Sequence, residues 1–541
     1  MSCALLSCGG ASDLHDTHPL LVDGPDDDRG VAALRVIINA SQLSEFFPNW
    51  NRLVVQQVAT GKLYSLQAVE SGWSSTALLV GVLPEGIYRT RLLRAVDGHS
   101  YSSAWRSAAT PPSLPHFAVT GGQLTDLGAL VYQPLAGDSR SQPQSLIYRD
   151  SDRISVAAVI AELFPRLHRA ITATAVSHWL DEDPTIPATL PPRLQTRIHA
   201  AATISGPLNT GLDGEVLLPA RMGQIHARSA SGHWRTYDTG LRLALHHVAL
   251  LPDGQYMATG ESGIILTAPK LSGPWQLSPG PRANASALRL IQLDQHASSN
   301  GWYQLTRIGH EDTVVDDWLL RSEARAGVVK SLLYYTPAPL TQPDWRELNA
   351  PDNANGVFHL QADRIHYRSN EGLYQYDPDH RNWSAIDAPP FTHYQLLGMD
   401  SAVAYDARFR DLPLRMAVYR DGHNWQTLDG IFPSSLPVRH GQGFYVVARA
   451  SLTLGSGETV PELGAQLYFN DLNQAKWWPL ITMPELCTLQ ARLYSLHNAV
   501  WAQCAGSQIF RFSKNGWILE WQPELETADF QPFAAPPKTT T

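Results

Sequence analysis

Charge is in short supply in this sequence. Only 17% of its 541 residues are Asp, Glu, Lys or Arg, against about 25% in an average globular chain. The formal net charge is -9 and no basic run occurs, so we expect no nucleic-acid partner. No stretch reaches the roughly 18 consecutive apolar residues that a transmembrane helix needs. At about 150 residues per domain, the length predicts two or more domains or a repeat fold.

Cysteine is rare as well, with four residues in the whole chain. Cys487 and Cys504 flank a predicted hairpin, and two interpretations are open: a local disulfide, which would suit an exported protein, or two buried thiols. No Cys-x-x-Cys pair or Cys/His cluster occurs, so we expect no metal site. No phosphate-cradling loop occurs either, and we expect no cofactor.

A third cysteine, Cys8, follows Leu5-Leu6-Ser7 and precedes Gly9-Gly10. This stretch resembles the lipobox of bacterial lipoproteins, in which the cysteine becomes the lipidated N-terminus. The resemblance covers four residues, and the basic and apolar segments that usually precede a lipobox are missing. Two alternatives remain: a lipoprotein whose start lies further upstream, tethered to a membrane through Cys8, or an ordinary frayed terminus.

Glycine, proline and tryptophan are plentiful, with 39, 38 and 16 residues. Together with few charges, they favour many short strands and turns. The clearest unit is residues 250–275, in which apolar strands are separated by Asp253-Gly254 and by the turn 260–263 and end at Trp275. Glycine in such dipeptides accepts the positive φ that tight hairpins need.

Weaker copies of this unit follow to the end of the chain, each marked by a tryptophan. Successive marks are 41, 70, 38, 42, 52 and 40 to 44 residues apart. A period near 40 with several strands per unit is typical of propeller blades. We therefore predict a seven-bladed β-propeller in which each mark packs between neighbouring blades. The marks are Trp234, Trp275, Trp345, Trp383, Trp425, Trp477 and Trp521, with Trp517 an alternative to the last.

The repeated unit resembles the BNR or Asp-box repeat, S-x-D-x-G-x-T-W, of sialidases and photosystem II stability factor-like propellers. The best matches are residues 229–234 and 267–275. The first lacks the Asp and is two residues short, and the second has a longer loop. The resemblance implies a propeller similar in fold to WD40 and YVTN proteins, and it implies nothing firm about chemistry.

The chain before the repeats is expected to form other structures. Residues 1–30 are interpreted as a signal remnant or linker, and residues 31–135 as an Ig-like or transthyretin-like β-sandwich, because five or more short strands alternate with turn signals. The phrase LPEGIY at 83–88 is similar to a structural turn of transthyretin-like domains. Residues 206–525 would then form the propeller, and 526–541 a disordered tail.

Residues 136–205 are predicted to be a helical connector. Apolar residues at 156–164 recur at helical spacing, 170–180 could form a second helix, and Pro187, Pro191 and Pro192 indicate an extended segment. This connector either covers a site or packs as a plug between the two domains. A second break in the repeats, at 311–330, is interpreted as an insertion. Function is expected where the repeats break.

No catalytic set can be assembled from the sequence. A sialidase-like enzyme needs converging arginines and acidic residues, and the candidates at Arg364, Arg368, Asp406, Arg408, Arg410 and Asp411 are more simply surface ion pairs. His246 and His247 are adjacent on a predicted strand, so we expect one in the core and one on the surface.

These observations favour a mainly β protein without catalytic activity. It would be associated with the bacterial cell envelope, in the periplasm or on the outer membrane, or be secreted. One propeller face would hold a protein or glycan partner. The alternative is a sialidase-like glycoside hydrolase or lyase with its site in the propeller channel.

Overall fold

The computed structural model covers the strands, the short helices and part of the connections between them. It contains no helix that is long and apolar enough to cross a membrane within the described part of the chain. The described residues are 14–16, 28–39, 50–68, 76–97, 104–109, 114, 116–134, 145–150, 152–163, 176–177, 179–180, 192–251, 253–261, 264–278, 295–297, 302–308, 329–335, 344, 346–352, 356–361, 364–377, 380–386, 393–396, 401–407, 413–420, 424–428, 431–441, 443–453, 459–461, 464–471, 477–487, 491–504 and 507–523.

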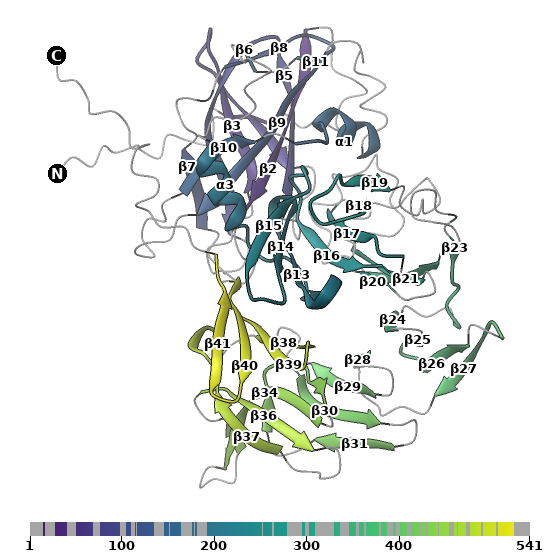
Figure 1. Ribbon diagram of the computed structural model, residues 1–541. Helices are drawn as coiled ribbons and strands as arrows, with labels where there is room; N and C mark the ends of the chain where they lie inside the picture. Colours follow the sequence, from purple (N-terminus) through teal and green to yellow (C-terminus); the bar gives the residue numbers. More distant parts are fainter. Residues whose placement is uncertain are drawn as a thin grey trace.

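The first part of the chain forms a single curved sheet with the shape of a half-barrel (Figure 1). Its main strands run in the order β10-β9-β2-β5-β4-β3-β6-β7, while β1, β11 and β8 pair with β4, β9 and β6. The strands are β1 (Leu14–Asp16), β2 (Arg29–Ile38), β3 (Trp50–Gln57), β4 (Leu63–Ala68), β5 (Thr76–Pro84), β6 (Gly86–Asp97), β7 (Ala104–Ala109), β8 (Phe117–Val119), β9 (Leu124–Pro134), β10 (Ser145–Asp150) and β11 (Val176–Ser177).

The predicted sandwich of two facing sheets is not confirmed. Strand β2 is hydrogen-bonded on both sides, antiparallel to β5 and parallel to β9, so strands that would belong to two sheets of a sandwich are joined into one. The sheet also extends beyond residue 135, because β10 and β11 from the predicted connector both pair with β9. We call it the N-terminal sheet.

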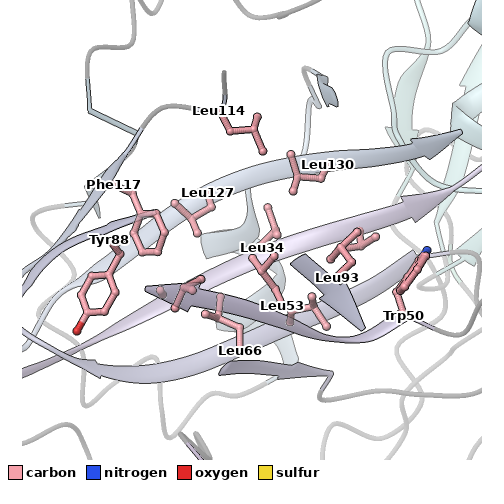
Figure 2. Packing of buried hydrophobic residues seen from close by; sticks show 14 of the residues in the cluster. Leu34, Trp50, Leu53, Leu66, Tyr88, Leu93, Leu114, Phe117, Leu127 and Leu130 are labelled. Atoms are coloured by element: carbon pink, nitrogen blue, oxygen red, sulfur yellow. The ribbon is translucent and has the colours of Figure 1, made fainter. Parts of the chain in front are cut away.

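Both faces of β2 are buried, as expected for a strand at the centre of a covered sheet. Because side chains alternate along a strand, Leu34 and Val36 join the core inside the curve of the sheet, and Val31 and Ala33 lie on its outer face. The inner core holds large aromatic residues: Tyr88 and Phe117 stack with ring centroids 5.6 Å apart, and Figure 2 shows them beside the leucines of neighbouring strands.

Two helices, α1 (Val156–Leu163) and α3 (Pro192–Ala200), cover the outer face. The helix predicted at 156–164 is confirmed. The helix predicted at 170–180 is wrong, because Val176 and Ser177 form β11 and Trp179 bridges to Phe117. The extended segment predicted at Pro192 is also wrong, since this proline is the first residue of α3, where its missing N–H costs no helical hydrogen bond.

Seven further sheets follow in chain order within the described residues, and we number them sheet 1 to sheet 7. At least five of them are arranged as propeller blades. Sheets 1 to 3 are β12 (Asn209–Thr210), β13 (Val216–Pro219), β14 (Gln224–Arg228) and β15 (Trp234–Asp238); β16 (Leu245–Leu250), β17 (Tyr256–Gly260), β18 (Ile265–Ala268) and β19 (Gln276–Ser278); and β20 (Gln295–Ala297), β21 (Trp302–Ile308), β22 (Val329–Tyr335) and β23 (Arg346–Glu347).

The remaining sheets have the same plan, each strand pairing antiparallel with the next, and sheet 6 carries two extra short strands. Sheets 4 to 7 are β24 (Val357–Gln361), β25 (Arg364–Arg368), β26 (Leu373–Asp377) and β27 (Asn382–Ile386); β28 (His393–Leu396), β29 (Ser401–Ala407), β30 (Pro413–Arg420) and β31 (Asn424–Leu428); β32 (Ile431–Pro433), β33 (Val438–His440), β34 (Gly443–Thr453), β35 (Thr459–Pro461), β36 (Gln466–Asp471) and β37 (Trp477–Thr482); and β38 (Ala491–Leu496), β39 (Ala499–Cys504), β40 (Ile509–Ser513) and β41 (Gly516–Trp521).

The unit predicted at 250–275 lies in sheet 2. Its strands are β16, β17 and β18, and Trp275 stands immediately before β19. The turn predicted at Asp253-Gly254 is confirmed, because Gly254 has a φ of +83°, a backbone conformation that side chains with a Cβ rarely adopt. Residues 262–263 of the other predicted turn lie outside the described residues.

Candidate functional site

The tryptophan marks recur at one place in the fold, the start of the outermost strand of a sheet. Trp234 and Trp477 are the first residues of β15 and β37, and Trp275 directly precedes β19. Trp383 is the second residue of β27, and Trp425 the second of β31. Trp345 lies outside the described residues, as does the side chain of Trp425.

Several of these rings pack between neighbouring sheets. Trp275 is buried in a cluster formed by sheets 1 and 2, and Trp477 in one that joins Val403 of sheet 5 to sheet 6. Trp383 packs mainly within sheet 4, and its Nε1 donates to the carbonyl oxygen of Asn349 at 3.1 Å. The described marks therefore lie in apolar clusters, as their large apolar area favours.

Sheet 7 resolves the choice between its two tryptophans. Trp517 is the second residue of β41 and takes the repeated position, packing in the cluster shared by sheets 6 and 7. Trp521 ends the same strand and packs against sheet 1, with its ring centroid 6.4 Å from that of Trp234 and 4.6 Å from that of His226. Trp521 is thus a contact between the first and last sheets.

The predicted cysteine sites have different outcomes. Cys487 and Cys504 form a disulfide that ties the segment entering sheet 7 to β39, with their Cα atoms 4.6 Å apart. Cys8 and the predicted insertion at 311–330 fall outside the described residues, except for the first residues of β22.

The first strands of successive sheets lie next to one another, with contacts from β12 to β16, β20, β24 and β28 in turn. The seven first strands, β12, β16, β20, β24, β28, β32 and β38, contain no aspartate or glutamate. Glycoside hydrolysis usually requires a pair of carboxyl groups flanking the scissile bond. These strands supply no such pair, so the hydrolase alternative finds no support in them.

The expectation for the two adjacent histidines is wrong. His246 and His247 are 5% and 4% exposed, and the register of β16 against β17 shifts between Leu245 and His247. A bulge of this kind interrupts strict alternation, so neighbouring side chains need not point to opposite faces. Within the described residues, no group of three His, Cys, Asp or Glu side chains is placed to hold a metal ion.

Exposed apolar side chains gather on the outermost strands of sheets 6 and 7. On β37, Trp478 and Leu480 are 41% and 44% exposed; on β41, Ile518 and Leu519 are 41% and 45% exposed. The pairing of β36 with β37 skips Leu480, because Leu467 faces Ile481 and Tyr468 faces Pro479. This bulge leaves Leu480 without a cross-strand partner, which re-aims side chains at a sheet edge.

The two outer strands approach each other at one point. The Cδ1 atom of Ile481 on β37 lies 3.4 Å from the position that a Cβ on Gly516 of β41 would take, and Ile481 and Trp517 share one apolar cluster. We call Trp478, Leu480, Ile518 and Leu519 the apolar rim. In the described structure β37 and β41 each pair with one strand only, β36 and β40, and thus end their sheets (Figure 1).

The chemistry of the rim suits contact with another macromolecule. Its members are a tryptophan and three aliphatic residues, without an ionisable group, and large aromatic side chains dominate the binding energy of protein interfaces. Clustered apolar exposure on a folded protein commonly marks such an interface. A signal for the rim exists in the sequence: the stretches WWPLIT and GWILEW place apolar residues side by side where a half-buried strand would alternate.

Comparison with known proteins identifies no family for this chain. No family model and no curated protein sequence match the chain. Among solved structures, BamB from Moraxella catarrhalis is similar over 60% of this chain and 84% of that one, with 11% identity and a TM-score of 0.32. Sqt1 from Saccharomyces cerevisiae is similar over 59% and 85%, with 8% identity and a TM-score of 0.35.

A computationally designed protein, Ika8, is similar over 59% of this chain and 86% of that one, with 11% identity and a TM-score of 0.35. TM-scores this low carry no argument about function. The resemblance to the Asp-box repeat stays a prediction.

Proposed function

We propose that this chain is a non-catalytic binding or assembly module whose apolar rim holds a protein partner. The observation that carries the proposal is the presence of four exposed apolar side chains on two outer strands that approach each other at Ile481 and Gly516. A glycan partner is less well matched, because sugar recognition relies on placed polar groups and the rim residues offer only the indole N–H of Trp478.

We further propose that all seven sheets form one closed propeller. Sheets 1 and 7 meet through Arg228, whose Nε donates to Glu520 Oε2 at 2.7 Å, while Arg511 donates to Glu520 Oε1 at 2.6 Å. Both guanidinium groups also lie over the ring of Trp501, at 5.6 and 5.9 Å from its centroid. These contacts between the first and last sheets support ring closure and hold β41, and with it half of the rim, in place.

The test uses a charge placed inside the rim and a matched charge outside it. Leu519→Asp disrupts the rim, and Leu277→Asp alters an equally solvent-facing leucine, 52% exposed, on the outermost strand of sheet 2. Proteins captured from the native host by the unaltered chain are identified, purified and titrated against both variants. We expect Leu519→Asp to weaken binding at least about 30-fold, as for a central interface residue.

Leu277→Asp is expected to bind like the unaltered chain. Equal weakening by the two variants would contradict the rim as the binding surface. Turnover of a glycoside by the purified protein, abolished by one carboxylate substitution, would instead favour the hydrolase alternative.

We also propose that the chain functions in an oxidising compartment, in the bacterial cell envelope or after secretion. The disulfide between Cys487 and Cys504 supports this, since such bonds persist mainly outside the cytosol. Tethering through a lipid on Cys8 remains part of this proposal. Labelled fatty acid should appear on the protein expressed from an upstream start and vanish in Cys8→Ser, and an unlabelled product would remove the tether.

A further inference from the structure

Five side chains from three parts of the fold meet beside α3. Asp150 ends β10 of the N-terminal sheet, Gln195 and His199 lie on α3, Asp238 ends β15 of sheet 1, and Arg242 follows in the connection to β16. We call them the junction cluster. Figure 1 shows α3 next to β10 and β15, where the N-terminal sheet adjoins sheet 1.

Arg242 holds both carboxylates of the cluster. Its Nε donates to Asp150 Oδ2 at 2.9 Å, and its two terminal nitrogens donate to the two oxygens of Asp238 at 2.9 and 3.1 Å. Gln195 Nε2 donates to Asp150 Oδ1 at 2.7 Å. One guanidinium thus faces two carboxylates, and the Asp150 carboxylate is buried.

His199 lies between the same two carboxylates. Its Nε2 lies 3.0 Å from Asp150 Oδ2 and its Nδ1 lies 3.5 Å from Asp238 Oδ2. A neutral imidazole carries one N–H and can donate to one of these oxygens only, whereas an imidazolium donates to both. The geometry is therefore complete only when the ring is protonated.

The electrostatic surroundings agree with this geometry. Burial by itself would lower the pKa of His199, but its hydrogen bonds with Asp150 and Asp238 outweigh burial, and the pKa is raised above its ordinary value. On β10, burial raises the pKa of Tyr148 well above its usual range, so the phenol stays neutral.

Other charged and titratable groups also lie around α3. Arg153 lies beside the turn at Gly240 and donates to the carbonyl oxygen of Thr239 at 3.2 Å. On β14, Arg228 pairs with Glu520 and burial lowers the pKa of His226 to about 4. The exposed arginines nearby are Arg193, Arg197 and Arg235.

We propose that His199 is a proton-operated clamp, which in its protonated form fastens α3 to both the N-terminal sheet and sheet 1. Loss of the proton removes one of the two donors. The contact with Asp238 is then released, because it is the longer one and its carboxylate is 39% exposed and can be hydrated instead. The clamp would make the junction tighter in mildly acidic surroundings than in alkaline ones.

The clamp acts on α3 and not on the whole junction. A separate set of contacts joins the N-terminal sheet to sheets 1 and 2: Arg221 donates to the carbonyl oxygen of Ile38 at 2.7 Å, and Thr76 donates to Glu261 at 2.8 Å. None of these contacts involves a histidine. They hold the two regions together when the clamp is open, so the effect should be confined to α3 and the turn at 238–242.

Hydrogen exchange of the α3 backbone amides between pH 6 and 9, corrected for the intrinsic exchange rate, tests this proposal. A histidine whose pKa is raised on folding stabilises the folded state fully below the pKa of the unfolded chain, about 6.5. This stabilisation is lost as the pH rises through the pKa of the folded state. We expect protection of residues 193–200 to fall about tenfold for each unit by which the folded pKa exceeds the unfolded one. β2 and β5 should show no matching loss.

Three variants accompany the measurement. In His199→Gln the pH dependence should disappear, and in His380→Gln, which removes an exposed histidine 2.7 Å from Asp377, it should persist unchanged. Asp238→Asn should move the midpoint to lower pH and decides the question if His199→Gln does not fold. Constant protection across this range in the unaltered chain, or the same loss in His199→Gln, would overturn the proposal.

Discussion

The N-terminal sheet and the seven sheets that follow are both built of short strands, but they are connected in different ways. In the N-terminal sheet β2 pairs in parallel with β9, placing Val31 opposite Leu124, which is 93 positions further along the chain. In sheets 1 to 7 nearly every strand pairs with its neighbour in sequence. The N-terminal sheet therefore has a large inner core that depends on distant pairing, whereas the later sheets share smaller cores with their neighbours.

This difference determines how far the loss of stability caused by one substitution should extend through the fold. Proteins of stacked repeats are stabilised mainly by contacts within and between adjacent units. A sheet with one continuous core loses stability as a whole when a central side chain is removed. Four changes, taken from the largest expected effect to the smallest, test this difference between the N-terminal sheet and sheets 1 to 7.

Phe117→Ala should have the largest effect. Phe117 is fully buried, stacks on Tyr88 and contacts Trp179 edge-on at 5.7 Å between ring centroids. Its removal is expected to cost about 3–5 kcal/mol and to increase exchange throughout the N-terminal sheet. Denaturant unfolding with hydrogen exchange measures both. Increased exchange limited to β8 and its immediate partners would contradict the expectation that the N-terminal sheet loses stability as a whole.

Reduction of the disulfide should have a smaller and more local effect. The two cysteines are 17 residues apart in sequence, and a loop of this size corresponds to about 3 kcal/mol in the loop-closure model. We expect weaker protection of β38 to β41 and of the rim residues on β41, with the N-terminal sheet unchanged. The comparison is between oxidised protein and a Cys487→Ser, Cys504→Ser variant.

Acidification should act at the boundary of the two regions through His226. This buried ring on β14 donates from Nε2 to the carbonyl oxygen of Ala202 at 2.8 Å and accepts from Thr236 at Nδ1. Burial lowers its pKa from 6.5 to about 4, so the unfolded chain binds the proton first. Stability is complete above about pH 6.5 and falls as the pH approaches 4, by roughly 3 kcal/mol. His226→Gln should flatten this slope in urea unfolding series.

Asp344→Asn should have the smallest effect. Asp344 accepts from Arg346 at 2.7 Å, but both side chains are more than half exposed, and such ion pairs contribute about 0–1 kcal/mol. We expect a change in melting temperature within experimental error. A loss comparable to that of the disulfide would mean that sheet 3 relies on this pair in a way its exposure does not indicate.

Sequence patterns predicted the repeated region well because its information is local. Asp253-Gly254 sets a turn of sheet 2, and a tryptophan lies at the start of the outer strand in every sheet except sheet 3, whose Trp345 is outside the described residues. The N-terminal sheet was predicted less well, since nothing near β2 in sequence indicates that β9 will be its partner. The helix expected at 170–180 failed for the same reason: its apolar residues serve β11 and Trp179, which contact distant strands.

The candidate sites divide in the same way. The positions of the tryptophan marks and the proximity of Cys487 and Cys504 follow from local spacing. The apolar rim does not, because WWPLIT and GWILEW suggest buried strands until the edge position of β37 and β41 is known. The junction cluster could not be predicted from local spacing either, because Asp150, His199 and Arg242 are separated by tens of residues.

What the sequence by itself determined is the class of fold, a chain of short strands and tight turns with a repeated unit, because turn chemistry and strand alternation act over a few residues. The tertiary structure alone decided which strands pair in the N-terminal sheet, which apolar side chains are exposed to solvent, and which charged groups are buried. Those outcomes depend on contacts between segments far apart in the chain, and the free energy of burying a leucine or a carboxylate is set by its surroundings and not by its neighbours in sequence.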